Sequence, residues 1–109
     1  MNRVFLDGHV KTFQKSPNEV LDYVRKATVF LDTDTISTST WTTDNGITID
    51  SSSNDTDSAT VWLSGGTDGN TYKVTNKIVT AAGRTKEQHF FIKVIDPEAQ
   101  QVRDYQYNM

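Results

Sequence analysis

Two histidines are the side chains in this 109-residue sequence best suited to acid–base chemistry. His9 lies in the N-terminal segment, and His89 lies inside an apolar run beside Phe90 and Phe91. Strand-like alternation places His89 on the side of the chain opposite to Phe90. The chain has no cysteine and no Gly-x-Ser-x-Gly motif, so nucleophilic catalysis has no local support. We therefore interpret His89 as a surface or interface histidine and predict no catalytic residue.

Acidic residues form the tripeptide Asp-Thr-Asp twice, at 32–34 and at 55–57. Clustered carboxylates can hold Ca²⁺, but both clusters lack the glycine and glutamate spacing of an EF-hand loop. Aspartates in turns usually accept hydrogen bonds from their own backbone. The glycine-rich stretch 64–69 lacks the lysine of a phosphate-binding loop and is typical of a hairpin turn. We predict neither a metal nor a cofactor.

Two tryptophans, Trp41 and Trp62, are the strongest candidates for binding a partner. Alternation places each on the face opposite to the aliphatic residues of its strand. Three interpretations remain open for them: a protein interface, a core position with the face assigned wrongly by one residue, or a platform that stacks on sugars. Tyr105 and Tyr107 lie in a polar tail that either contacts a partner or is disordered. The predicted interface residues are Trp41, Trp62, Tyr105 and Tyr107.

The stretch 57–83 carries the clearest structural pattern and would organise the fold. Its two apolar runs each alternate with a period of two, which is typical of half-buried strands. Glycines at 65–66, 69 and 83 supply the positive φ that tight turns need. A polar turn followed by Tyr72-x-Val74 is typical of the tyrosine corner of immunoglobulin-like sandwiches. The inward-facing residues of the two runs are predicted to be Ala59, Val61, Leu63, Tyr72, Val74, Asn76 and Ile78.

The first third of the chain is harder to interpret. Residues 1–12 alternate weakly and fit either an arm that docks on a neighbour or an edge strand. Residues 16–18 form a turn signal, and Ser16 with Glu19 has capping-box spacing. We expect at most one helical turn there, with a longer helix to about Ala27 as the rival, because the β-branched residues that follow weaken a helix.

Further strands are expected on both sides of the central stretch. Residues 23–31 alternate, with Arg25 as an interruption. In the run 35–43, Ile36 and Trp41 are predicted on opposite faces. A short strand at 47–49 is expected to end in a polar loop at 51–55. The last strand runs from about Lys86 to Ile95, where Pro97 follows and cannot donate to a ladder.

Composition and charge narrow the class of protein. Hydrophobic residues make up 35% of the chain, which suits a two-layer sandwich better than a helical bundle. We predict an all-β, immunoglobulin-like antiparallel β-sandwich of about seven strands at 13–95, with an arm at 1–12 and a tail at 96–109. The net charge of −3 does not match a basic nucleic-acid footprint. No apolar run reaches membrane-spanning length, and the first residues lack a signal-peptide core, so synthesis in the cytoplasm is expected.

Four blocks of the sequence carry a resemblance to a known family. They are KSPNEVLDY at 15–23, DTISTSTWT at 34–42, GITIDSSS at 46–53 and, most specifically, ATVWLSGGTDGNTYKVTNKIVTAAGRT at 59–85. From about Phe13 to Val94 the chain resembles the fiber–tail adaptors of tailed phages. It departs from that pattern at Arg25 and Ala27, where the family's strand is usually more apolar, with an aromatic residue near its middle.

The resemblance implies a non-enzymatic structural protein of the phage virion, made in the host cytoplasm and carrying no cofactor. Its expected partners are tail, neck or fibre proteins, and several copies would sit on a symmetric ring. Binding to nucleic acid or to a membrane is not expected. Two alternatives remain beside the adaptor: a capsid decoration protein, and a carbohydrate-binding adhesion module.

Overall fold

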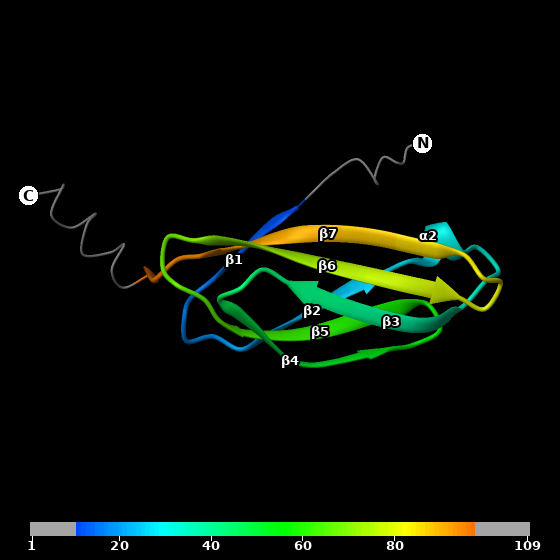
Figure 1. Cartoon of the computed structure of the whole chain (residues 1–109), viewed down its shortest axis with the longest axis horizontal. Coiled ribbons are helices and arrows are strands. Elements are labelled where there is room, and N and C mark those ends of the chain that lie inside the picture. The colour runs from blue at the N-terminus through cyan, green and yellow to red at the C-terminus, as the bar shows by residue number, and fades with distance from the viewer. Residues whose placement is uncertain (1–10, 98–109) are drawn as a thin grey trace, which may run out of the picture.

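A computed structural model describes residues 11–97, which form two β-sheets packed face to face (Figure 1). Residues 1–10 and 98–109 lie outside the described part, and with them the predicted arm and the predicted interface residues Tyr105 and Tyr107. The four-stranded sheet has the order β1-β7-β6-β3, and the three-stranded sheet has the order β2-β5-β4. The strands are β1 (Thr12–Lys15), β2 (Leu21–Lys26), β3 (Ile36–Thr43), β4 (Ile47–Asn54), β5 (Ser58–Gly65), β6 (Thr71–Thr80) and β7 (Thr85–Val94).

The prediction of an all-β sandwich of about seven strands is confirmed for the described residues. Strand order β2-β5-β4 in one sheet and β7-β6-β3 in the other corresponds to the order of the immunoglobulin sandwich. The expectation that every pair is antiparallel is wrong for one pair, because β1 runs parallel to β7, with Thr12 opposite Phe91. These two strands lie at opposite ends of the described chain, so no tight turn forces them to be antiparallel.

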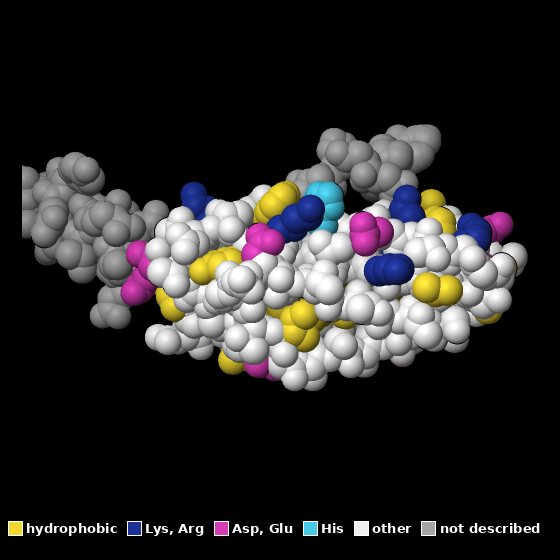
Figure 2. All heavy atoms as spheres, in the orientation of Figure 1, with side chains coloured by type: hydrophobic (Ala, Val, Ile, Leu, Met, Phe, Trp, Pro, Cys, Tyr) yellow, Lys and Arg dark blue, Asp and Glu magenta, His cyan; other side chains and the backbone are white. Residues whose placement is uncertain are grey.

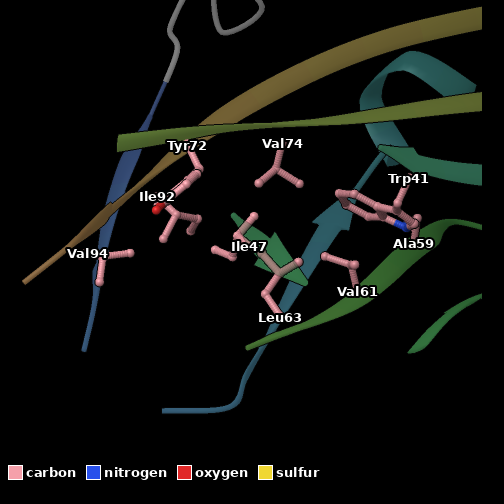
Figure 3. Close-up of a cluster of buried hydrophobic side chains, with 9 residues drawn as sticks. All are labelled: Trp41, Ile47, Ala59, Val61, Leu63, Tyr72, Val74, Ile92 and Val94. Atoms are coloured by element: carbon pink, nitrogen blue, oxygen red, sulfur yellow. The ribbon is translucent and has the colours of Figure 1, made fainter. Parts of the chain in front are cut away.

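Apolar side chains from both sheets meet in the space between them. Alternation in β5 and β6 turns every second side chain inward, as the sequence predicts. Figure 3 shows these side chains pointing toward one another from the two layers. The main cluster consists of Trp41, Ile47, Ala59, Val61, Leu63, Tyr72, Val74, Ile92 and Val94.

The predicted tyrosine corner is present at the start of β6. The Tyr72 hydroxyl accepts a hydrogen bond from the backbone N–H of Thr67, five residues upstream, at 2.9 Å. The turn before it contains Gly66 at φ +97°, where an added Cβ would lie 2.5 Å from the Cγ2 atom of Val94. Glycine is therefore required there for its backbone conformation and for space.

At residues 16–31 the structure agrees with the expectation of at most one helical turn after Ser16 and excludes the rival longer helix to Ala27, but the strand predicted at 23–31 needs correction. The predicted capping-box contact forms, since the Ser16 N–H donates to the Glu19 Oε1 at 2.8 Å, but no helix follows it. The chain enters β2 instead and pairs with β5 over its whole length. A single helical turn, α2, comes later at Thr28–Leu31, where a strand was predicted. Long-range pairing with β5 has overridden the local helix signal.

The predicted loop at 51–55 is also wrong. Strand β4 continues through the serines to Asn54 and pairs with β5 along its whole length. Its register shifts between Ile49 and Ser51, which marks a bulge. The serine-rich half of β4 faces solvent, so its side chains are polar like those of a loop. Its backbone is nevertheless hydrogen-bonded as a strand, which composition alone does not reveal.

Candidate interaction surfaces

An exposed tryptophan stands on the outer face of the three-stranded sheet. Because Val61 and Leu63 of β5 point into the core, Trp62 between them points outward, and it is 41% exposed. Its neighbours in register are Asp22 of β2 and Ser51 of β4. The sequence placed Trp62 on this outer face correctly.

Two valines extend this apolar area along β2. Val20 and Val24 are 54% and 53% exposed, and they flank Asp22, the residue opposite Trp62. We call Val20, Val24 and Trp62 the tryptophan patch. On the face of the molecule shown in Figure 2, hydrophobic side chains form small separate areas within a largely uncharged polar surface. A patch with one large aromatic side chain is the kind of surface that anchors a protein contact.

Trp41 does not lie on a surface, so its predicted outward orientation is wrong. It is 7% exposed and packs edge-on against Phe90, with ring centroids 6.2 Å apart. The reason is an irregularity in β3 between Ile36 and Thr38, where the register with β6 shifts. One extra residue changes the parity of the strand, so Ile36 and Trp41 both face inward.

A groove of about 800 Å³ lies between β2 and β7, at the side of the sandwich where the two sheets do not close on each other. Its aromatic end is formed by Phe13, Tyr23 and Phe90, whose ring centroids lie 5.5–5.7 Å apart. The Tyr23 hydroxyl is buried there, and no residue of the described part of the chain forms a hydrogen bond with it. Its burial raises the pKa of Tyr23, with the nearby charges of Glu19 and Asp22 acting in the same direction.

The floor of the groove contains a polar bridge between the sheets. The Arg25 Nε donates to the Gln88 Oε1 at 2.6 Å, and its Nη1 donates to the Asn76 Oδ1 at 2.9 Å. Asn76 is fully buried and donates in turn to the Ser39 Oγ at 2.9 Å. Arg25, an interruption in the sequence pattern, is therefore the residue that satisfies a buried amide from the opposite sheet. Asn76 on an otherwise apolar face was the sequence signal for such a partner.

The groove is more basic than the chain as a whole. Four basic side chains and two acidic ones line it, although the chain carries a net charge of −3. An acidic partner would therefore be favoured at this site. The charged lining residues are Lys11, Arg25, Lys26, Lys86, Asp22 and Glu87.

A buried lysine ties the short strand β1 to the other sheet. Lys15 is 1% exposed, and its Nζ donates to the carbonyl oxygens of Gly65 at 2.6 Å and Ser16 at 2.9 Å. Burial lowers the pKa of Lys15, and the charges of Glu19 and Asp50 partly oppose that shift. Both acceptors are backbone atoms, so this contact is structural.

The first Asp-Thr-Asp cluster is used in turn chemistry. The Asp34 carboxylate accepts hydrogen bonds from the backbone N–H groups of Thr35 and Ala82 at 2.8 and 3.1 Å. It also forms an ion pair of 3.1 Å with Arg84. A hydrogen bond from the Thr80 side chain, followed by those from Thr35, Arg84 and Ala82, lowers the pKa of Asp34 to about 2. These contacts hold the β6–β7 turn against the loop that precedes β3.

The second cluster behaves similarly at the turn into β5, where the Ser58 Oγ donates to the Asp55 Oδ2 at 3.4 Å. Within residues 11–97, no group of three or more histidine, aspartate or glutamate side chains is arranged to hold a metal ion. No helix in that range has the length and apolar character needed to cross a bilayer.

His89 lies on the exposed outer side of β7, as the sequence predicts. Its ring packs edge-on against Phe91, with centroids 5.8 Å apart. This position is opposite to the inward-facing Phe90, so His89 does not line the core.

Comparison with known proteins assigns the chain to a family. A family model described as podophage GP4 fiber-tail adaptor protein gp77 matches residues 15–93, which include nearly all of both sheets. No curated protein matches the chain.

Proposed function

Because the chain belongs to the podophage GP4 fiber–tail adaptor family, we propose that it joins fibres or other appendages to the tail or neck of a phage particle without catalysing a reaction. The observation that carries the proposal is the family match across both sheets of the sandwich. The expected partners are tail, neck or fibre proteins, and the protein would be made in the host cytoplasm before it joins the virion.

We further propose that the tryptophan patch is one of the contact surfaces of the adaptor. Trp62 offers a large, already rigid apolar surface, and the two exposed valines beside it extend that surface. Loss of such an aromatic anchor typically costs about 2 kcal/mol of binding free energy, which is roughly a thirtyfold loss of affinity. Several copies on a ring would add their contacts, so a modest affinity for each copy is sufficient.

Binding of purified protein to tail particles that lack it tests this proposal. We expect Trp62→Ala to reduce binding roughly thirtyfold per site at unchanged thermal stability. Phe91→Ala is the matched control, because it removes an aromatic side chain from the outer face of the other sheet. If Phe91→Ala abolished binding while Trp62→Ala left it intact, the opposite face would be the contact surface. If the unchanged protein bound no tail component and was missing from particles, the adaptor function itself would be refuted.

The exposed Trp62 also supports a second candidate, a carbohydrate-binding adhesion module, because tryptophan rings stack on sugars. Trp62 lies on the outer face of a sheet and does not line the groove, which favours a protein contact. A glycan array distinguishes the two functions: glycan binding that is lost in Trp62→Ala selects the adhesion module. Detection of the protein on the capsid shell, away from the tail vertex, selects a decoration protein.

A further inference from the structure

The outer edge of β7 is only half covered by β1. Strand β7 has ten residues, and β1 pairs with Phe91–Val94 alone. Among the described residues, no strand pairs with the 85–90 half on that side. This half-strand borders the groove between β2 and β7, and β2 is itself the edge strand of the other sheet. Exposed strand edges are ready templates for pairing with another chain.

The hydrogen-bonding pattern identifies which backbone groups face this open edge. The N–H groups of Phe91 and Ile95 donate to the carbonyl oxygens of Lys11, just before β1, and of Lys15, its last residue, at 2.9 and 2.8 Å. The Val94 N–H instead donates to Asn70 on the β6 side. Because the direction alternates along a strand, the N–H and C=O groups of Glu87 and His89 point to the open edge.

We propose that an extended segment of a neighbouring virion protein pairs with residues 85–90 of β7 and fills the groove as an added strand. The inference rests on the proposed adaptor function and names the chemistry of one of its partners. Main-chain hydrogen bonds to Glu87 and His89 supply the pairing, and pockets for alternate side chains supply selectivity.

The lining of the groove specifies the added strand. At one end, the exposed ring of Phe13 lies beside Tyr23 and Phe90, and this end accepts an apolar side chain. Further along, Lys26 and Lys86 line the groove with a single acidic residue, Glu87, and this end accepts carboxylates. The partner segment is therefore extended and acidic, with an apolar side chain at the end that meets the aromatic rings.

Amide hydrogen exchange tests the pairing without any substitution. In the isolated full chain, we expect the Glu87 and His89 amides to exchange rapidly, while the amides of Gln88 and Phe90, which face β6, are protected. In tail particles containing the protein, the 87 and 89 amides become protected. Protection already present in the isolated chain at every concentration would assign the edge to a segment of the same chain and overturn the proposal. Protection that rises with protein concentration would assign it to a second copy and likewise overturn it.

A pair of substitutions at one position tests the same point by assembly. His89→Pro removes only an N–H that faces the open edge, whereas His89→Ala keeps it and removes the outward side chain. We expect His89→Pro to reduce incorporation into tails about tenfold relative to His89→Ala, which shares the loss of the imidazole but keeps the N–H. Thermal unfolding of each variant establishes whether it is folded. If His89→Pro does not fold, the hydrogen-exchange measurement on the unchanged chain still tests the added strand.

Charge reversal tests the acidic character of the partner. We expect Lys26→Glu to weaken incorporation roughly three- to tenfold, and Lys77→Glu, on the outer face of β6, to leave it unchanged. Equal effects of both reversals would contradict the acidic partner. Normal incorporation of His89→Pro, with 87 and 89 amides that still exchange in the particle, would refute the added strand while leaving the adaptor function in place.

Discussion

Replacing Tyr23 by phenylalanine removes a buried hydroxyl that makes no hydrogen bond within residues 11–97. A buried polar group without a partner costs about 1–3 kcal/mol of desolvation. The phenyl ring would keep its contacts with Phe13 and Phe90. We expect Tyr23→Phe to raise the free energy of unfolding by about 1 kcal/mol, the low end of that range, because the tyrosine as a whole is only partly buried. For a domain of this size, that gain raises Tm by about 4–8 °C.

The matched control is the same change at Tyr72, where it should have the opposite sign. The Tyr72 hydroxyl accepts hydrogen bonds from the Thr67 N–H at 2.9 Å and from the Asn70 Nδ2 at 3.4 Å. Tyr72→Phe deletes both and loosens the turn before β6, so its Tm falls. Urea and thermal unfolding of the two variants beside the unchanged protein provide the measurement. If Tyr23→Phe lowered the stability as much as Tyr72→Phe, the claim that the buried Tyr23 hydroxyl destabilises the folded protein would be refuted.

Alkaline titration distinguishes the same two side chains. Burial raises the pKa of Tyr23 above 10.0, so the stability tied to its neutral phenol is present below pH 10 and is lost as the pH rises through the folded-state pKa. Hydrogen bonds from Asn70 and Thr67 lower the pKa of Tyr72. In an alkaline titration followed by phenolate absorbance, Tyr23→Phe should therefore lose the component that titrates at the highest pH. Tyr72→Phe should lose a component that titrates at lower pH.

Three other predictions concern turns and ionisable groups. The hydrogen bonds around Asp34 hold its pKa at about 2 instead of 3.8, so its contribution to stability is present above pH 3.8 and disappears as the pH falls toward 2. The free energy of unfolding of Asp34→Asn should therefore depend less on pH in that window than that of the unchanged protein. Gly66→Ala should lose more stability in urea unfolding than Gly69→Ala, because both incur about 1–2 kcal/mol of left-handed backbone strain and only the first also meets Val94. The pKa of Lys15 is lowered in the folded state, so the unfolded chain binds the Lys15 proton more strongly. The free energy of unfolding of the unchanged protein should therefore rise as the pH approaches 10.5, and that of Lys15→Met should rise less.

The second half of the chain was predictable because local pattern and long-range pairing agree there. In β5 and β6, alternation with a period of two predicts the inward-facing residues, and the intervening glycines adopt the positive φ that their turns require. The Tyr72 corner followed from sequence for the same reason, since its hydrogen bond spans only five residues. Trp62 was placed correctly because β5 is regular along its whole length in its pairing with β2.

The first half was less predictable because distant partners decide it. A bulge in β3 is invisible in the sequence, and that single residue moves Trp41 from the predicted surface into the core. The capping-box contact of Ser16 and Glu19 is compatible with a turn before a strand as well as with a helix, and pairing of β2 with β5 decides between them.

The groove could have been predicted in part from the polar residues on core-facing positions, because each such residue needs a hydrogen-bond partner. Asn76 interrupts the apolar face of β6, and Arg25 interrupts that of β2. A buried amide without a hydrogen bond is costly, so two such interruptions in strands from different sheets are most simply explained if they meet. They do meet, at 2.9 Å. A long charged side chain that crosses between the sheets brings polar groups to the inter-sheet space beside the open edge of β7, which is where the groove lies.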